Sequence, residues 1–458
     1  MASITSLANE LLVNVASSLD QQSLCSLNLV SKKFSPIARD ILYSRPYIPP
    51  PYGRDGLRTE PDDRLLHLIR TLLDNPEYAE KVHRLTFSTG LCRVPEEGFG
   101  FAEMRRKGVE VVRKFASASV REDWIAKLDL GDHDAWGGVL LAIVPTLKVL
   151  EFQPLSVTPE DGPTYHIWQK LFRGDKMGGT IDLNLIPGLK GLQHLHFYGD
   201  YFQWEWLKLS SLQFLRLGVV CHMPVPEEMA NHGISPGTIS AITTLAITQR
   251  VPFDSHAVQP HLGHSLAHPI FSNMARLEVH ISNLLHLPDP GRGPGTLVRL
   301  YDASRHCGDW DYLGPQLEYL SDRLESFWLG VKSGEDPGFL DSINPFGTLP
   351  SPTTLTVLTK LKTLVLPQDA LFKDGEPIPD LCQLLPASLQ TLGLLYPTKQ
   401  LCDFLDCFLL SMGSFPHLRT LELHCRNDRG VDYPTMCSDD NPKWDELKEA
   451  GFAVEIYH

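Results

Sequence analysis

The sequence predicts an α/β chain in which three short amino-terminal helices precede a stack of units that each pair one strand with one helix. Apolar residues recur at helical spacing through the first 44 residues, and a triple of apolar residues recurs from residue 82 onward. Stretches rich in proline and glycine separate many of these triples. We expect parallel strands inside the stack and helices outside it, an architecture that can extend through most of the 458 residues.

The spacing of apolar residues predicts the three helices. The apolar stripe of the first predicted helix consists of Leu11, Leu12, Val15 and Leu19, and that of the second of Leu24, Leu27, Val30 and Phe34. Ser35 is expected to cap a third helix that begins at Pro36. Helices this short bury little apolar surface alone, so the sequence predicts that a partner completes their burial.

This segment resembles an F-box. The matching residues are Glu10-Leu11-Leu12, Leu19-Asp20, Leu24, Leu27, Val30-Ser31-Lys32 and Phe34, whereas Ala8 stands where the family usually has proline. The resemblance implies that residues 1–45 dock a Skp-type adaptor protein and, through it, a cullin. The residues expected to bind the adaptor are Leu7, Leu11, Leu12, Val15, Leu19, Leu24, Leu27, Val30 and Phe34. The alternative is that these helices only cap the larger domain.

The recurring triple places apolar residues at its first, fourth and sixth positions. In an extended segment the fourth and sixth residues point to one face, predicted to be the core, and the third, fifth and seventh point outward. Copies begin at Val82, Ile125, Leu147, Leu192, Leu212, Ile242, Met274, Leu324, Leu361, Leu389 and Leu418. The last four begin 28 to 37 residues apart, enough for a strand and a returning helix. Such units resemble degenerate leucine-rich repeats, because few copies carry the asparagine that usually follows.

Proline, glycine and helix signals suggest how the parts connect. Residues 46–63 contain three consecutive prolines and are expected to form a stiff, extended joint. A helix at 65–73 should end at Asn75-Pro76, and residues 64–458 form the predicted repeat domain, closed by a helix that turns at Gly451 into a last strand. The order of these parts resembles fungal F-box proteins. The long gaps expected to be inserted loops are 155–180, 254–272, 284–296 and 331–352.

Charge and cysteine content restrict the function. The 41 basic and 55 acidic residues give a net charge of -14, which argues against nucleic acid as a partner. No apolar run approaches the ~18 residues of a membrane span, and the amino terminus has no secretory signal. The nine cysteines are an odd number and form no close pairs, so we expect free thiols and a location in the cytoplasm or nucleus.

Several motifs could carry chemistry, but each has a simpler explanation. Gly263-His264-Ser265-Leu266-Ala267 lacks the second glycine of a hydrolase nucleophile elbow. The histidines at 256, 261, 264 and 268 lie in a predicted loop without metal-binding register, and Cys402 and Cys407 lie in an apolar helical run. Met104-Arg105-Arg106-Lys107 is interpreted as a solvated helix face. We therefore expect no catalytic residue, no metal and no cofactor, and a chain that is not an enzyme.

The sequence thus predicts a substrate-recognition adaptor of a Skp-cullin-F-box ubiquitin ligase, in which the strands' outward residues bind a protein target. Those outward residues are His194, His196, Tyr198, Phe214, Arg216, Arg276, Glu278, His280, Trp328, Glu422 and His424. A repeat scaffold without a ligase role is the alternative, and a serine hydrolase using Ser265 is the least favoured interpretation.

Overall fold

The computed structural model divides the chain into two compact units, Met1–Leu215 and Arg216–His458, and each unit is described by itself. The residues that the structure describes are 7–48, 64–89, 100–116, 118–154, 183–199, 202, 204–218, 237–250, 266, 268–282, 317–331, 355–372, 375, 377–397, 400–425, 438 and 441–457.

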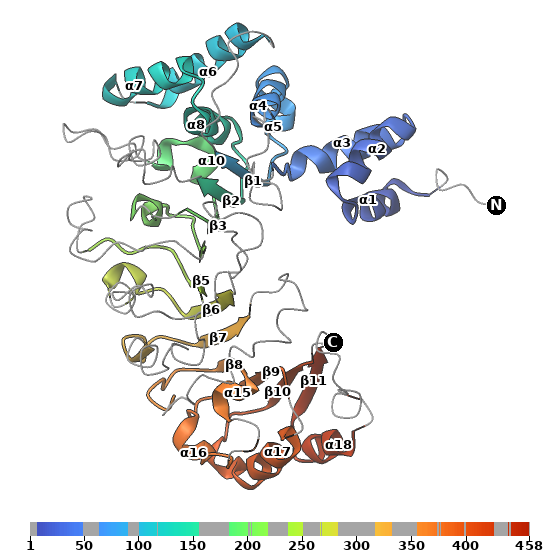
Figure 1. The fold of residues 1–458 in the computed structure, drawn as a ribbon, viewed down its shortest axis with the longest axis vertical. Coiled ribbons are helices and arrows are strands. Elements are labelled where there is room, and N and C mark those ends of the chain that lie inside the picture. Colours follow the sequence, from blue (N-terminus) through green and yellow to red (C-terminus); the bar gives the residue numbers. More distant parts are fainter. Residues whose placement is uncertain are drawn as a thin grey trace, which may run out of the picture. The chain divides into compact units, whose positions relative to one another are not determined.

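Three helices form the amino-terminal part of the first unit (Figure 1). They are α1 (Asn9–Ser17), α2 (Gln21–Val30) and α3 (Phe34–Ser44). The Asp20 carboxylate caps α2 by accepting a hydrogen bond of 2.6 Å from the Ser23 backbone N–H. Ala16, Leu24, Ala38 and Ile41 form their shared core.

The predicted start of the third helix is wrong by two residues. The helix α3 begins at the buried Phe34, so Ser35 lies in its first turn and donates a hydrogen bond of 2.8 Å to Asn28 Oδ1 instead of capping the helix. Pro36 is the third helical residue. It is tolerated there because the first backbone N–H groups of a helix have no partner within the helix.

Within the described residues, eleven strands follow one another in chain order as a parallel sheet, which confirms the predicted fold class of N-terminal helices followed by stacked strands and helices (Figure 1). The first unit contains β1 to β3, the second contains β5 to β11, and β4 spans the boundary. The strands are β1 (Arg84–Thr89), β2 (Val149–Pro154), β3 (His194–Phe197), β4 (Phe214–Leu217), β5 (Thr244–Arg250), β6 (Arg276–Ser282), β7 (Ser326–Val331), β8 (Thr363–Pro367), β9 (Thr391–Leu395), β10 (Thr420–His424) and β11 (Ala453–Tyr457).

The apolar triples build the core of the sheet. At ten of the eleven predicted copies, all of which lie in the described residues, each of the three apolar side chains is at most 2% exposed. The register aligns them from strand to strand, as in the pairing of Phe87 with Phe152 and of Phe152 with Phe197. The ring centroids of these two pairs are 5.0 and 6.0 Å apart.

The copy that begins at Ile125 is an error of the sequence prediction. It lies in a helix, α7 (Ala118–Asp129), and Leu130 just beyond the helix is 73% exposed. A spacing of three residues, as between Ile125 and Leu128, suits a helix as well as the repeat. In α7 the buried face holds Trp124 and Leu128, which are four residues apart.

Three helices between β1 and β2 form an insertion that was not predicted as a whole, although residues 104–107 in the first of them were predicted to be helical. They are α6 (Phe101–Phe115), α7 and α8 (His133–Ile143). Trp124 and Trp136 are buried between them, and the Trp124 indole N–H donates a hydrogen bond of 3.0 Å to the Ala135 carbonyl. Gly108 and Gly138 lie against these two rings, so close approach of the helices requires residues without a side chain.

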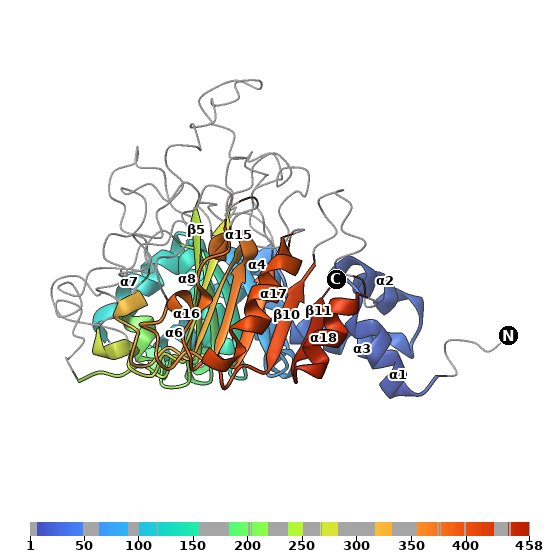
Figure 2. The same ribbon diagram turned by 90° about the horizontal axis from the view of Figure 1, so that it is seen from below.

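Other short helices flank the strands. In the first unit these are α4 (Arg64–Asp74), α5 (Pro76–Ala79), η3 (Leu183–Leu185), α10 (Pro187–Lys190) and η4 (Trp204–Lys208). In the second they are η5 (Pro269–Phe271), α15 (Gln368–Leu371), α16 (Leu381–Leu384), α17 (Leu401–Leu410), η6 (Met412–Ser414) and α18 (Pro442–Glu449). The helices α17 and α18 lie beside β10 and β11 (Figure 2).

Several predicted boundaries are confirmed. The helix α4 ends at Asp74, directly before Asn75-Pro76. At the other end of the chain, Gly451 adopts a φ of 93°, which favours glycine, and turns α18 into β11.

The predicted loops lie mostly outside the described residues. This holds for 155–180 and 284–296, whereas Val331 belongs to β7. The end of the predicted loop 254–272 is not a polar insertion, because Ile270 and Phe271 in η5 are buried.

One cysteine departs from the expectation of free thiols. Cys425, which directly follows β10 and is 4% exposed, is disulfide-bonded. Cys25, Cys382, Cys402 and Cys407 are free. Sequence spacing alone does not show which cysteines meet in space, which explains the error. No helix among the described residues is long and apolar enough to cross a membrane.

Gly188 offers a test of the packing between α10 and α8. A Cβ atom at this position would lie 2.2 Å from the Leu141 carbonyl oxygen, a backbone atom that cannot rotate away. Gly188→Ala is expected to lower the free energy of unfolding by about 1–3 kcal/mol, measured by chemical denaturation. Gly413→Ala is the control, because nothing lies within 4 Å of its added Cβ. Equal stability of the two variants would contradict the packing described here.

Candidate protein-binding surfaces

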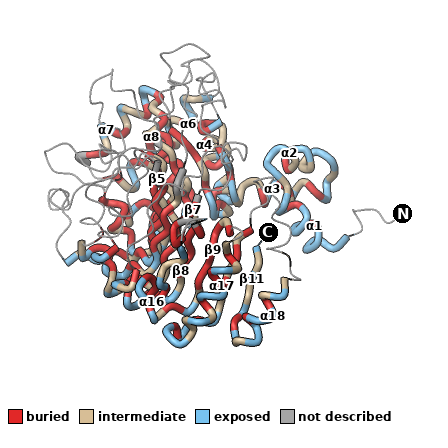
Figure 3. Tube along the Cα trace, turned by 60° about the horizontal axis from the view of Figure 1, so that its bottom comes forward, coloured by how far each residue is buried: buried red, intermediate tan, exposed pale blue. Residues whose placement is uncertain are grey.

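Much of α1 and α2 is exposed (Figure 3), and the exposed residues include large apolar ones. Leu11 and Val15, four residues apart on one face of α1, are 51% and 48% exposed. The complete set of exposed large apolar residues in described residues 7–48, apart from Tyr47, is Leu7, Leu11, Val13, Val15, Leu29 and Val30. Apolar surface gathered in a small domain is typical of a protein-binding surface.

The nine residues predicted to bind an adaptor therefore fall into three groups. Leu7, Leu11, Val15 and Val30 are exposed. Leu19 and Leu27 are half-buried and pack against the three-helix core. Leu12, Leu24 and Phe34 are buried. The single stripe expected on the first helix is thus divided between core and surface, and the sequence analysis missed Val13 and Leu29.

The helix α3 directly contacts α5 and the residues that lead into β1. The rings of Tyr43 on α3 and Tyr78 on α5 stack with centroids 4.3 Å apart and an interplanar angle of 4°. Arg39 donates a hydrogen bond of 3.3 Å to the Tyr78 hydroxyl, and Asp40 forms an ion pair with Lys81. Burial, followed by the neighbouring Tyr78, raises the pKa of Tyr43.

Backbone hydrogen bonds also join the end of α3 and the residues after it to β1 and the residue before β1. The His83 N–H donates to the Ser44 carbonyl at 2.9 Å, and the Ile48 N–H donates to the Thr86 carbonyl at 2.8 Å. Tyr47 forms a parallel bridge with Thr86 of β1. The prolines at 49–51, which were predicted to form a stiff joint, lie outside the described residues. The residues between α3 and these prolines are already attached to β1.

In the first unit, the outward residues of the strands form small polar and aromatic contacts. Glu151 forms an ion pair with Arg84, and its carboxylate lies 3.7 Å from His196 Nδ1. The rings of His194 and Phe214 stack with centroids 5.4 Å apart. The half-buried Tyr198 follows β3, and its N–H donates a hydrogen bond of 2.9 Å to the Phe152 carbonyl.

In the second unit, charged residues gather around Glu278 on β6. Its carboxylate lies 3.0 Å from Arg276 Nε, 3.1 Å from His280 Nε2 and 3.7 Å from an Arg216 terminal nitrogen. Burial alone would raise the pKa of the Glu278 carboxyl, but the hydrogen bond from His280 and the nearby charges lower it. Glu278 is therefore a buried carboxylate stabilised by cationic neighbours.

Trp328 on β7 borders this group. Its ring centroid lies 4.5 Å from that of His280, and the indole lies over Gly330, where an added Cβ would be 2.4 Å from the ring. Gly330 thus leaves the space that the indole fills.

A second group lies on β10 and β11. Glu422 lies 3.5 Å from His424 Nε2, and the His424 ring stacks on Tyr457 with centroids 4.6 Å apart. The Tyr457 hydroxyl donates a hydrogen bond of 2.6 Å to Glu455. This hydrogen bond, with smaller effects of burial and of the charges of Glu422 and Glu455, raises the pKa of Tyr457 to about 12.

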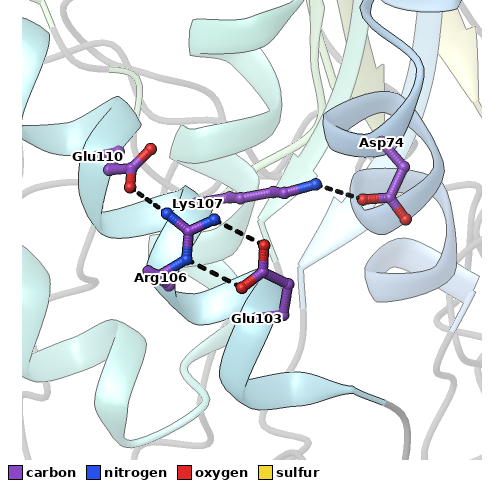
Figure 4. A network of polar contacts seen from close by, with 5 residues as sticks. All are labelled: Asp74, Glu103, Arg106, Lys107 and Glu110. Carbon is purple, nitrogen blue, oxygen red and sulfur yellow. Dashed lines mark hydrogen bonds and ion pairs between the residues drawn. The ribbon is translucent and has the colours of Figure 1, made fainter.

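The structure also places some of the motifs considered for chemistry. His268 caps η5, its Nδ1 accepting a hydrogen bond of 3.2 Å from the Ile270 N–H. Burial raises the pKa of the Cys402 thiol. On α6, Arg106 forms ion pairs with Glu103 and Glu110, and Lys107 forms one with Asp74, as expected for a solvated helix face (Figure 4). Ser265 and the histidines at 256, 261 and 264 lie outside the described residues.

Comparison with known families identifies the class of the amino-terminal segment. Residues 5–49 match a family model described as F-box-like, so the chain carries an F-box-like domain at the helices α1 to α3. A search of curated proteins found no match. The assignment of the strands to leucine-rich repeats, the fungal type and the domain limits 1–45, 46–63 and 64–458 stay predictions.

The charged group around Glu278 predicts a pH dependence of stability. Because the pKa of Glu278 is lower in the folded chain, the unfolded chain takes up the proton first as the pH falls below about 4.3. The stabilisation is therefore complete above that pH and is lost as the pH falls through the pKa that Glu278 has in the folded chain. Glu278→Gln is expected to reduce this acid-induced loss, measured by denaturation between pH 6 and pH 3, and an unchanged profile would contradict it. Glu325→Gln, at a surface ion pair, is the control.

Proposed function

We propose that this protein is a substrate-recognition adaptor of a Skp-cullin-F-box ubiquitin ligase. The F-box-like match at residues 5–49, together with the exposed Leu11 and Val15, is the observation that supports the proposal. The exposed face of α1 and α2 would bind the Skp-type adaptor, which would connect the chain to a cullin. The outward residues of the strands would bind the target protein.

In this proposal the chain is not an enzyme and acts by bringing two proteins together. Binding both partners raises their effective concentration, and a conjugating enzyme within the assembled complex performs the covalent step. The stacking of Tyr43 on Tyr78 and the bridge between Tyr47 and Thr86 support this role, because they hold α3 against the first strand. A fixed attachment limits the positions that a bound target can take. We further propose a location in the cytoplasm or nucleus.

Substitutions on the exposed face of α1 test the adaptor interaction. Leu11→Asp and Val15→Asp place a charge on a surface that the proposal buries, while leaving the inward Leu12 unchanged. Each is expected to weaken binding of the Skp-type adaptor by about 2 kcal/mol or more, measured by co-purification and by titration of the purified proteins. The control is Leu410→Asp on α17, which alters a residue that is 89% exposed.

Retained adaptor binding by both α1 variants would overturn the proposal and leave the repeat scaffold as the remaining function. Deleting residues 1–45 would not separate the two, because α3 contacts α5 and the residue before β1, and its removal would disturb the fold under either function. Point substitutions at exposed positions avoid this difficulty.

A further inference from the structure

The outward face of the second unit carries opposite charges at its two ends. Strand register places one row of outward residues side by side from β6 to β11: Glu278, Trp328, Val365, Gly393, Glu422 and Glu455. Beside the first of these lies the 51% exposed side chain of Arg276, and Arg216 also lies within 4 Å of the Glu278 carboxylate. At the other end lie the carboxylates of Glu422 and Glu455.

Arg276 is held in a position to bind an anion. Its Nε lies 3.0 Å from the Glu278 carboxylate, while its side chain remains 51% exposed. Among the described residues its two terminal nitrogens contact no other acceptor. A guanidinium fixed through Nε presents these nitrogens as a fork, which matches the two oxygens of a carboxylate or phosphate.

The middle of the row carries no charge. Trp328 is half-buried, and its ring covers Gly330, while Val365 covers Gly393. The residues here are therefore small or apolar, and Trp328 is the aromatic one among them that remains partly accessible. Aromatic side chains of this kind contribute strongly to protein interfaces.

The acidic end has no compensating cation on its outward strand positions. Within the described parts of β10 and β11, these positions hold Thr420, Glu422, His424, Ala453, Glu455 and Tyr457, with no lysine or arginine. Glu455 is exposed and already accepts a hydrogen bond from Tyr457. A basic side chain is the group that this end would bind.

We propose that this face binds an extended target segment that carries an acidic group over Arg276 and a basic group over Glu422 and Glu455. This inference rests on the proposed function and specifies its substrate class. The four strand intervals from β6 to β10 span about 19 Å at roughly 4.8 Å each. An extended segment rises about 3.3 Å per residue, so the two charged groups should lie about six residues apart. Uncharged residues should lie between them.

Peptide display tests the proposal even though the target protein is unidentified. A random twelve-residue peptide library on phage is selected against the full-length chain and, in parallel, against Arg276→Glu, Glu455→Lys and Lys448→Glu. The last is a control that reverses an exposed charge on α18. We expect the wild type and the control to enrich peptides with Asp or Glu about six positions from Lys or Arg. Arg276→Glu should lose the acidic preference and Glu455→Lys the basic one, each at least tenfold.

Thermal unfolding of each variant establishes that it is folded. If Arg276→Glu is unstable because it lies beside Glu278, Arg276→Gln, which adds no negative charge, replaces it. The absence of enriched peptides, enrichment without the paired charges, or the same pairs in every variant would overturn the proposal.

Synthetic peptides distinguish the two sources of the acidic group. One enriched sequence is prepared with Asp, phosphoserine or Ser at the acidic position, and its binding is measured by fluorescence anisotropy. Tighter binding of either charged form supports the anion site and identifies carboxylate or phosphate as the preferred group. Equal binding of the Ser form would overturn it. Adaptor binding, measured on the same variants, is expected to be unchanged, so failure here is distinguishable from failure of the ligase function.

Discussion

Burial of apolar side chains between neighbouring strands is the constraint on which the structure depends. No strand of four to seven residues buries its own leucines, so each strand needs the neighbouring strand and its helix to cover its apolar positions. The aligned rows, such as Phe87, Phe152 and Phe197, show how this requirement is met. Because side chains alternate along a strand, fixing the inward rows also fixes which residues face outward.

This alternation gives the outward residues a defined arrangement, because each one is held by the inward residues on either side of it. Glu278 and Trp328 lie side by side because Leu277 and Phe327 beneath them are paired in the core. The charged groups therefore rest on a scaffold whose register cannot slip without exposing buried leucines. Outward residues held in this way can differ while the inward ones keep the fold.

The same periodicity explains why so much of the fold could be predicted from the sequence. Ten apolar triples were placed correctly because their spacing directly reports burial in a strand, and Gly451 was placed correctly because a left-handed turn favours glycine. The helix α7 was assigned to a strand at Ile125 because a spacing of three also suits a helix. The contact of Tyr43 with Tyr78 and the disulfide at Cys425 depend on residues meeting in space, which periodicity does not report. For the same reason the residues around Glu278 were predicted to face outward, but their mutual contacts were not.

Unlike the buried apolar triples of the strands, the amino-terminal helices leave large apolar side chains exposed. Ala16, Leu24, Ala38 and Ile41 form the core that the three helices share, and the contact of α3 with α5 adds packing that a free domain of this size would lack. Leu11, Val15, Leu29 and Val30 are therefore not needed for the internal core and remain in contact with water. Removing such side chains from water stabilises a complex by roughly 25 cal/mol per Å² of apolar surface, so this face would contribute that stabilisation when another protein covers it. The division of neighbouring leucines between core and surface thus separates the residues that stabilise the helices from those left open to a partner.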